Sequence, residues 1–352
     1  MPSPCHCNSN RPIRTRALLH CIIWFSFLLI TLPTQAQTLT HIRETKTLRC
    51  GLNQETPEYS TSDDHGPRID FDTDLCRAVA VAILGPQARV LTTYYPDDVT
   101  ATEALHTGKI DLIPTQTLDL THATDPTLTF TTPILYDAVG LLVPISANLS
   151  QASQLDNKKI CFLAETEVEV ALRAWFLKQH LKFLPFPFQE EGEMEAAFVT
   201  NNCAALAGDL TRLASTRLAF GPLAARYALL PDQISQDPLA AATPSNDPGF
   251  AAIVRWTFEV LLDAEAQGLT QQNITTPHTD PTPTTAILTG QTHEIGARLS
   301  LPNDWATQVI AAVGNYGEIY TRTLGDQSPL KLPRAQNRLY TQGGLMYPIP
   351  LK

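Results

Sequence analysis

Short apolar runs and longer amphipathic runs follow each other in the same order in two blocks of the chain. The first block predicts a strand, helix, strand, helix and strand at 47–52, 70–84, 89–95, 97–107 and 110–113. The second block repeats that order at 159–163, 166–180, 183–188, 190–200 and 203–207. Alternating strands and helices are typical of parallel sheets with crossover helices. We therefore expect an α/β fold with two lobes, each a mostly parallel sheet flanked by helices.

The segments around these blocks indicate how the lobes connect. Residues 131–136 read as an extended connection into a strand at 140–143, and the pattern changes after about residue 233. Beyond it we expect helices at 250–266 and 303–324, a Thr/Pro-rich loop between them, and an irregular tail from residue 330. The expected organisation is a signal peptide, a first lobe, a second lobe, and a return to the first lobe with a C-terminal extension, at 1–36, 37–135, 136–235 and 236–352.

The first 36 residues have the features of an export signal. Three arginines precede an apolar run over 17–32, and small residues at 34–36 offer a cleavage site. A retained membrane anchor is the alternative, because the apolar run is nearly long enough to span a bilayer. We expect export with cleavage, and hence a periplasmic protein.

Composition and charge exclude some classes of function. With 43% hydrophobic and 17% charged residues, the chain is expected to bury sizeable cores. Cleavage of the signal removes three arginines and no acids, which leaves 22 basic and 35 acidic side chains and a formal charge of about −13. Such an acidic surface repels phosphate backbones, so no nucleic-acid partner is expected.

Four cysteines remain after cleavage, an even number that favours disulfides in an exported chain. Of the three possible pairings we expect Cys50 with Cys76 and Cys161 with Cys203, because each bond then stays within one predicted lobe. No second cysteine lies two to four residues from any of the four, and no His-Glu-x-x-His motif occurs. We expect neither a metal site nor a cofactor.

Polar residues follow the predicted strands where a ligand would bind. In open parallel sheets, ligands lie outside the carboxyl ends of the strands, here 51–59, 115–122, 164–166 and 207–209. The stretch TQTLDLTHATDPTLTF after the third strand holds six threonines, two aspartates and one histidine but no lysine or arginine. We expect this stretch to form half of a small-molecule cleft.

Several segments resemble those of type II periplasmic amino-acid-binding proteins of ABC importers. GLNQETPEY, IDFDTDLCRAVA, LHTGKIDLI and TTPILYDAVGLLV look like their successive landmarks. The runs NDWATQVIAAVGNYGEIYTRTLG, SPLKLPRAQNRLYTQGG and RWTFEVLLDAEAQGLTQQN are similar to the general L-amino-acid-binding subgroup, as are the positions of the four cysteines. The resemblance covers residues 38 to 352. It implies a monomeric, non-enzymatic receptor of the Venus-flytrap type, which closes about hinges near 131–138 and 233–240 on an amino acid or close analogue and delivers it to a membrane permease.

The resemblance also implies roles for single residues. Tyr59 matches an aromatic residue that packs on the ligand side chain, and Asp209 matches the aspartate that binds the ammonium group. Thr166 lies where a hydroxyl and helix N-terminal amides bind the carboxylate. Thr115 and Thr117 fall in the Thr-x-Thr part of the family's strand-three motif. Each residue also has a structural alternative, such as a helix cap for Asp209 and Thr166 or a surface tyrosine for Tyr59.

The chain departs from the family where an arginine normally clamps the ligand carboxylate. One alignment puts His122 at that position and another puts Ala123 there, and neither supplies a guanidinium. His122 is then a pH-dependent ligand or a solvated loop histidine. The family's Gly-Thr-Thr is Glu165-Thr166-Glu167 here, which adds negative charge at the expected carboxylate site.

Two other functions on the same scaffold follow from these departures. One is a sensor or partner-docking protein that no longer serves transport, which the missing arginine favours. The other is a dehydratase-like enzyme, for which the acids of Glu165, Glu167 and Glu169 are the candidate general acids or bases.

Overall fold

The computed structural model describes residues 37–53, 70–292 and 295–351. The predicted signal peptide and Tyr59 lie outside these residues. In the described part of the chain, no helix is both long and apolar enough to cross a membrane.

The strands of the first lobe form a two-stranded sheet, β2-β1, and a three-stranded sheet, β3-β10-β4, which lie side by side. β1 and β2 are parallel, and a parallel bridge between Cys50 and Leu112 joins β1 to the start of β3. β10 is antiparallel to both β3 and β4. The strands are β1 (Thr47–Asn53), β2 (Arg89–Tyr95), β3 (Ile113–Thr117), β4 (Leu128–Asp137) and β10 (Asp237–Pro244).

The sheet of the second lobe repeats this arrangement in the order β7-β6-β8-β5-β9. β6 is parallel to β7 and β8, and β5 is antiparallel to β8 and β9. β10 lies between β3 and β4, and β5 lies between β8 and β9. Each of these two strands directly follows a chain crossing between the lobes. The strands are β5 (Val139–Pro144), β6 (Lys159–Leu163), β7 (Leu184–Phe188), β8 (Ala205–Asp209) and β9 (Tyr227–Leu229).

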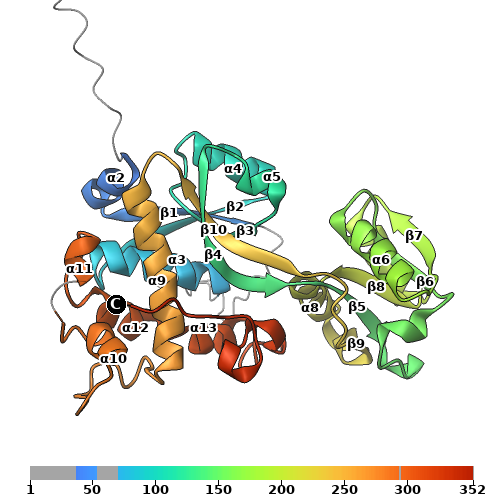
Figure 1. Cartoon of the computed structure of the whole chain (residues 1–352). Coiled ribbons are helices and arrows are strands. Elements are labelled where there is room, and N and C mark those ends of the chain that lie inside the picture. The colour runs from blue at the N-terminus through green and yellow to red at the C-terminus, as the bar shows by residue number, and fades with distance from the viewer. Residues whose placement is uncertain (1–36, 54–69, 293–294, 352) are drawn as a thin grey trace, which may run out of the picture. The chain divides into compact units, whose positions relative to one another are not determined.

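Helices cover the two sheets (Figure 1). The first lobe has α2 (Gln37–Thr45), α3 (Phe71–Leu84), α4 (Asp98–His106), α5 (Leu120–Ala123), α9 (Pro248–Ala266), α10 (Pro283–Leu288), α11 (Ile295–Arg298), α12 (Trp305–Val313) and α13 (Tyr316–Thr323). The second lobe has α6 (Glu167–Lys178), α7 (Glu191–Val199) and α8 (Leu210–Ala219). Short 3₁₀ turns lie at Ile145–Ala147, Ala152–Leu155, Gly221–Arg226, Ala335–Asn337 and Tyr340–Gln342.

The second-lobe strands are apolar on both faces because helices cover both. Successive side chains of a strand point to opposite faces. Phe162 therefore packs in a cluster with Phe176 of α6, whereas the neighbouring Cys161 packs with Phe198 of α7 and Leu213 of α8. This burial explains why β6 reads as a continuous apolar run, and β6 lies at the residues expected for it.

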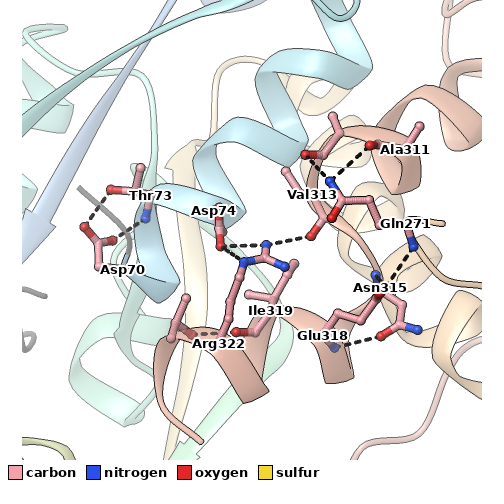
Figure 2. A network of polar contacts seen from close by, with 12 residues as sticks. Asp70, Thr73, Asp74, Gln271, Ala311, Val313, Asn315, Glu318, Ile319 and Arg322 are labelled. Carbon is pink, nitrogen blue, oxygen red and sulfur yellow. Dashed lines mark hydrogen bonds and ion pairs between the residues drawn. The ribbon is translucent and has the colours of Figure 1, made fainter. Parts of the chain in front are cut away.

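Ion pairing and capping hold the helices of the first lobe in place. Asp70 caps α3 by accepting a hydrogen bond from the Thr73 amide at 2.5 Å. Arg322 of α13 bonds Asp74 of α3 at 2.7 Å and also donates to the Val313 carbonyl (Figure 2). Burial raises the pKa of Asp74, although the nearby guanidinium of Arg322 opposes this rise. The pair therefore ties the C-terminal helices to the first crossover helix.

The single helix expected at 303–324 is wrong, because the structure has two helices there, α12 and α13. Gly314, at φ 78°, adopts a left-handed conformation that ends α12. Asn315 then starts α13 with a capping box, in which its side chain and that of Glu318 accept each other's backbone amides (Figure 2). The helical spacing of apolar residues continues through both helices, so it does not indicate the break between them.

Two strand boundaries differ from the sequence prediction in a way that matters for the site. The strand expected at 110–113 lies at Ile113–Thr117, and the strand expected at 203–207 lies at Ala205–Asp209. Asp111 instead forms an ion pair with Arg49 at 2.5 Å. Both strands pair with an antiparallel strand from a chain crossing, and this long-range pairing decides their ends.

The disulfides pair Cys50 with Cys76 and Cys161 with Cys203, as expected. The first joins β1 to α3, and the second joins β6 to the segment just before β8. Each bond therefore fixes a strand, β1 or β6, whose carboxyl end lies at the edge of the sheet where a ligand is expected.

The two chain crossings between the lobes lie next to each other. β4 ends at Asp137 and β5 begins at Val139, so one residue separates them. The returning strand β10 pairs with β4 from its first residue, with Asp237 opposite Asp137 (Figure 1). Burial raises the pKa of Asp137, whose carboxylate accepts bonds from the Ala138 amide and the Thr211 hydroxyl.

Candidate ligand-binding site

Two predicted ligand residues line one cavity at the carboxyl ends of the second-lobe strands. The cavity has a volume of about 200 Å³, and Thr166 and Asp209 both contribute to its wall. Arg212 and Glu191, two residues that the sequence analysis did not single out, line it as well. Acidic, hydroxyl and guanidinium groups therefore meet at the sheet edge where α/β proteins bind their ligands.

Asp209 is the last residue of β8 and precedes the first residue of α8. Its side chain makes no capping hydrogen bond to α8, although it occupies the N-cap position. The alternative role of a helix cap is therefore not realised here. The Leu210 amide donates to the Ala138 carbonyl at 2.9 Å, so the start of α8 is fixed to the crossing strand.

Thr166 begins α6 after a tight turn in which Glu165 has a φ of 60°. Its hydroxyl donates to the Leu163 carbonyl at 2.8 Å. The hydroxyl proton is thus already used, and the oxygen can accept a hydrogen bond more readily than it can donate one to a carboxylate. Glu165 and Glu167 are exposed on either side, which makes this helix start a poor carboxylate site by charge.

Arg212 and Glu191 form a two-pronged ion pair across the cavity wall. Arg212 Nε donates to Glu191 Oε1 at 2.8 Å, and one terminal nitrogen donates to Oε2 at 2.6 Å. The side chains remain 21% and 40% exposed. Arg212 lies three residues after Asp209, on the first turn of α8, and this spacing was the signal in the sequence that could have identified it.

Nearby Glu195 adds to the acidic character of this region. Burial raises the pKa of Glu195, and the carboxylate of Glu191 raises it further, while a hydrogen bond with Thr216 and the charge of Arg212 lower it. Within the described part of the chain, Arg212 is the one lysine or arginine that lines the cavity.

The threonines of β3 have internal roles in this structure. Thr115 is buried, and its hydroxyl donates to Asp72 Oδ1 at 2.7 Å, which fastens β3 to α3. Thr117 ends β3, is half-buried, and pairs with Leu239 of β10. The sequence analysis placed both after the third strand, whereas both lie in it, and their predicted contacts with ligand stay predictions.

His122 is held by its own short helix. Asp119 caps α5 by accepting from the His122 amide at 2.8 Å, and the same carboxylate oxygen lies 2.8 Å from Nδ1 of the ring. Partial burial acts to raise the pKa of Asp119, but the hydrogen bonds from His122 outweigh it and lower that pKa. Because Asp119 also caps α5, it is held at the imidazole, and the ring lacks the two-pronged guanidinium of the arginine that it would replace.

A larger cavity of about 680 Å³ lies at the amino-terminal side of the first sheet. Its polar groups pair with one another, as Arg49 does with Asp111 and His106 does with Thr127. Ligands of open α/β sheets bind at the opposite, carboxyl side. We therefore place the site at the smaller cavity. No group of three or more potential metal-ligating side chains is found among the residues that the structure describes.

Comparison with known proteins gives several relatives that match nearly the whole chain. YhdW of Escherichia coli, named as a candidate amino-acid ABC transporter-binding protein, is 34% identical over 90% of this chain and 92% of its own. The general L-amino acid-binding periplasmic protein AapJ of Rhizobium johnstonii is 33% identical over 90% and 93%. No protein-family model matches the chain.

A solved structure agrees in fold as well as in sequence. The ABC transporter periplasmic binding protein of Brucella ovis, solved with glutathione bound, is 32% identical and superimposes with a TM-score of 0.78 over 90% of this chain and 99% of that one. The named relatives are binding proteins and not enzymes. Because these relatives are 33–34% identical over 90% of its length, this chain belongs to the periplasmic amino-acid-binding proteins of ABC transporters and is a solute-binding receptor of that family.

Proposed function

We propose that the solute is an L-amino acid or a small amino-acid conjugate whose ammonium group binds Asp209. AapJ is named for L-amino acids, and the Brucella ovis protein holds glutathione, which carries one ammonium group and two carboxylates. The observation that carries the proposal is the place of Asp209 on the cavity wall at the end of β8, where its carboxylate does not cap α8. From this place the carboxylate can accept charge-assisted hydrogen bonds from the ammonium group of a ligand.

Calorimetry on the mature chain tests this proposal. Wild type is titrated with the twenty L-amino acids and glutathione, and Asp209→Asn is titrated with each solute that binds. Because charge-assisted hydrogen bonds contribute about 1.5–3 kcal/mol, the variant should bind about 10- to 150-fold more weakly. The exposed Asp326→Asn serves as the control and should bind as wild type does. Unchanged affinity in Asp209→Asn would show that Asp209 does not hold the ammonium.

The lobes close, in this proposal, about the two crossings at 131–138 and 233–240. Lobe one then comprises 37–135 and part of 236–352, and lobe two comprises 136–235. Support comes from the single residue between β4 and β5 and from the pairing of β4 with β10, which make the crossings a compact two-stranded joint. Small-angle scattering should show a smaller radius of gyration with solute than without it. An unchanged radius at saturating solute would argue against closure.

The receptor acts, we propose, as a monomer that presents the closed form to a permease. The chain carries disulfides within each lobe and no bond that needs a second copy among the described residues. Light scattering coupled to size exclusion should give the mass of one chain, with and without solute. A dimer mass at micromolar concentration would refute this part of the proposal.

A further inference from the structure

Among the described residues, the segment where the family has its carboxylate clamp supplies no cation for the ligand. The stretch 115–130, where the family resemblance leads one to expect an arginine, contains no lysine or arginine. His122 is engaged with Asp119, and the start of α6 is flanked by exposed glutamates. A carboxylate in a site that excludes water nevertheless requires a cation or several N–H donors.

Arg212 is in the right place to supply that cation. It lines the same cavity as Asp209 and Thr166, and it follows Asp209 by three residues on the first turn of α8. The carboxylate of Asp209 and the guanidinium of Arg212 thus both lie at the start of α8. A zwitterion needs such a pair of opposite charges, one for its ammonium group and one for its carboxylate. The helix start is itself fixed, because the Thr211 hydroxyl bonds Asp137 and the Leu210 amide bonds the Ala138 carbonyl.

The present partner of Arg212 has the same chemistry as the end of an amino acid. Glu191 meets the guanidinium through both carboxylate oxygens, at 2.8 and 2.6 Å, in the fork geometry that Arg offers to any carboxylate. A ligand carboxylate can therefore replace that of Glu191 without any change in the position of Arg212.

The exposure of the pair indicates that exchange of Glu191 for a ligand carboxylate costs little free energy. Glu191 is 40% exposed, so its released carboxylate is solvated by water, and half-exposed ion pairs contribute little net stability. Arg49 gives the contrast, because its partner Asp111 is only 2% exposed and cannot be released into water without moving the strand. Arg212 differs in having a partner that can leave.

We propose that Arg212 recognises the ligand carboxylate in this receptor, and that Glu191 occupies the guanidinium until the ligand displaces it. The inference rests on the proposed function, because it assigns the second charge of the same amino-acid-like solute. Arg212 thereby takes the role that an arginine after strand three has in the family, from the other lobe of the fold. Glu191 acts as an internal competitor and sets the affinity.

Paired ligands test the proposal by calorimetry on the mature chain. The probes are L-alanine with L-alaninamide, L-leucine with L-leucinamide, and L-glutamine with L-glutaminamide, or the same pair for any other amino acid that wild type binds. We expect Arg212→Gln to weaken the carboxylate form of a binding pair about 10- to 100-fold and to change the amide little. Arg212→Lys, which keeps the charge but loses the fork, should fall between wild type and Arg212→Gln.

Glu191→Gln gives the sharper result, because removal of the competing carboxylate should tighten binding of the carboxylate form by about 3- to 10-fold. The matched control is the other exposed glutamate–arginine pair of this lobe, Glu169 with Arg173 on α6, and neither Glu169→Gln nor Arg173→Gln should alter affinity by more than about 2-fold. Circular dichroism confirms that each variant is folded.

Three outcomes decide between the hypotheses. Weaker binding in Arg212→Gln together with tighter binding in Glu191→Gln supports the exchange. Equal weakening in both variants would mean that the pair only shapes the cavity, and unchanged binding in Arg212→Gln would remove Arg212 from the site; either result overturns this inference alone. Wild type that binds none of the twenty L-amino acids and does not bind glutathione overturns the proposed function, and this inference with it.

Discussion

Asp263 offers a test of whether a buried acid lowers the stability of this receptor near neutral pH. It lies on α9, one turn after Glu259, and the two side chains are 5% and 1% exposed. Glu259 accepts hydrogen bonds from the Thr132 hydroxyl at 2.8 Å and the Ile349 amide at 2.9 Å. Asp263 Oδ2 has no partner among the described residues. Burial, helped by the charge of Glu259, raises the pKa of Asp263 to about 7.

The sign of the effect follows from proton binding. Between its ordinary pKa of 3.8 and about 7, Asp263 is neutral in the folded chain and ionised in the unfolded one. The folded state therefore holds the extra proton, and the free energy of unfolding falls as pH rises through this window. At about 1.4 kcal/mol per pKa unit, the loss between pH 5 and pH 8 is at most about 2.7 kcal/mol, and residual water access reduces it to about 1–2 kcal/mol.

Asp263→Asn removes the charge but keeps the size and polarity of the side chain. The advantage of the variant over wild type in free energy of unfolding should be about 1–2 kcal/mol larger at pH 8 than at pH 5. For a chain of this length that is a relative shift of about 1.5–3 °C in Tm. Urea unfolding followed by circular dichroism at both pH values measures the difference, with the exposed Asp326→Asn as control. A difference between variant and wild type that is the same at both pH values would refute the reasoning.

Three further perturbations test the framework around the site. Arg322→Gln should lower the free energy of unfolding by about 3 kcal/mol, and by more at pH 8 than at pH 5, because Asp74 is left ionised and largely buried; urea unfolding at both pH values checks this. The double variant Cys161→Ala/Cys203→Ala should lower the free energy of unfolding by about 4 kcal/mol, as expected for a cross-link spanning 42 residues. Calorimetric unfolding of the variant beside oxidised wild type measures this loss, and reduced wild type, which lacks both disulfides, should lose more. Asp137→Ala should cost about 1–3 kcal/mol in urea unfolding, because it leaves two donors at the joint without an acceptor, while Asp137→Asn should retain one of those bonds and lose less.

Local pattern was enough to predict most elements of this fold. The strand expected at 89–95 lies at Arg89–Tyr95, and α3 begins after Asp70 because that side chain can cap it. The cysteine pairs follow from the assignment of those elements to two lobes. Such features depend on neighbours a few residues apart, and an amino-acid sequence states those directly.

Tertiary contacts decided the features that the site depends on. Asp209 belongs to a strand because β5, from the chain crossing, pairs with it, and Thr115 points to Asp72 because β3 lies against α3. The ion pair of Arg212 with Glu191 joins residues 21 apart on two helices. An amino-acid sequence shows the charge of each residue but not which charged residues come into contact in the folded protein. The amino-acid sequence alone therefore determined the two-lobed α/β receptor, and packing between distant segments decided which groups face its ligand.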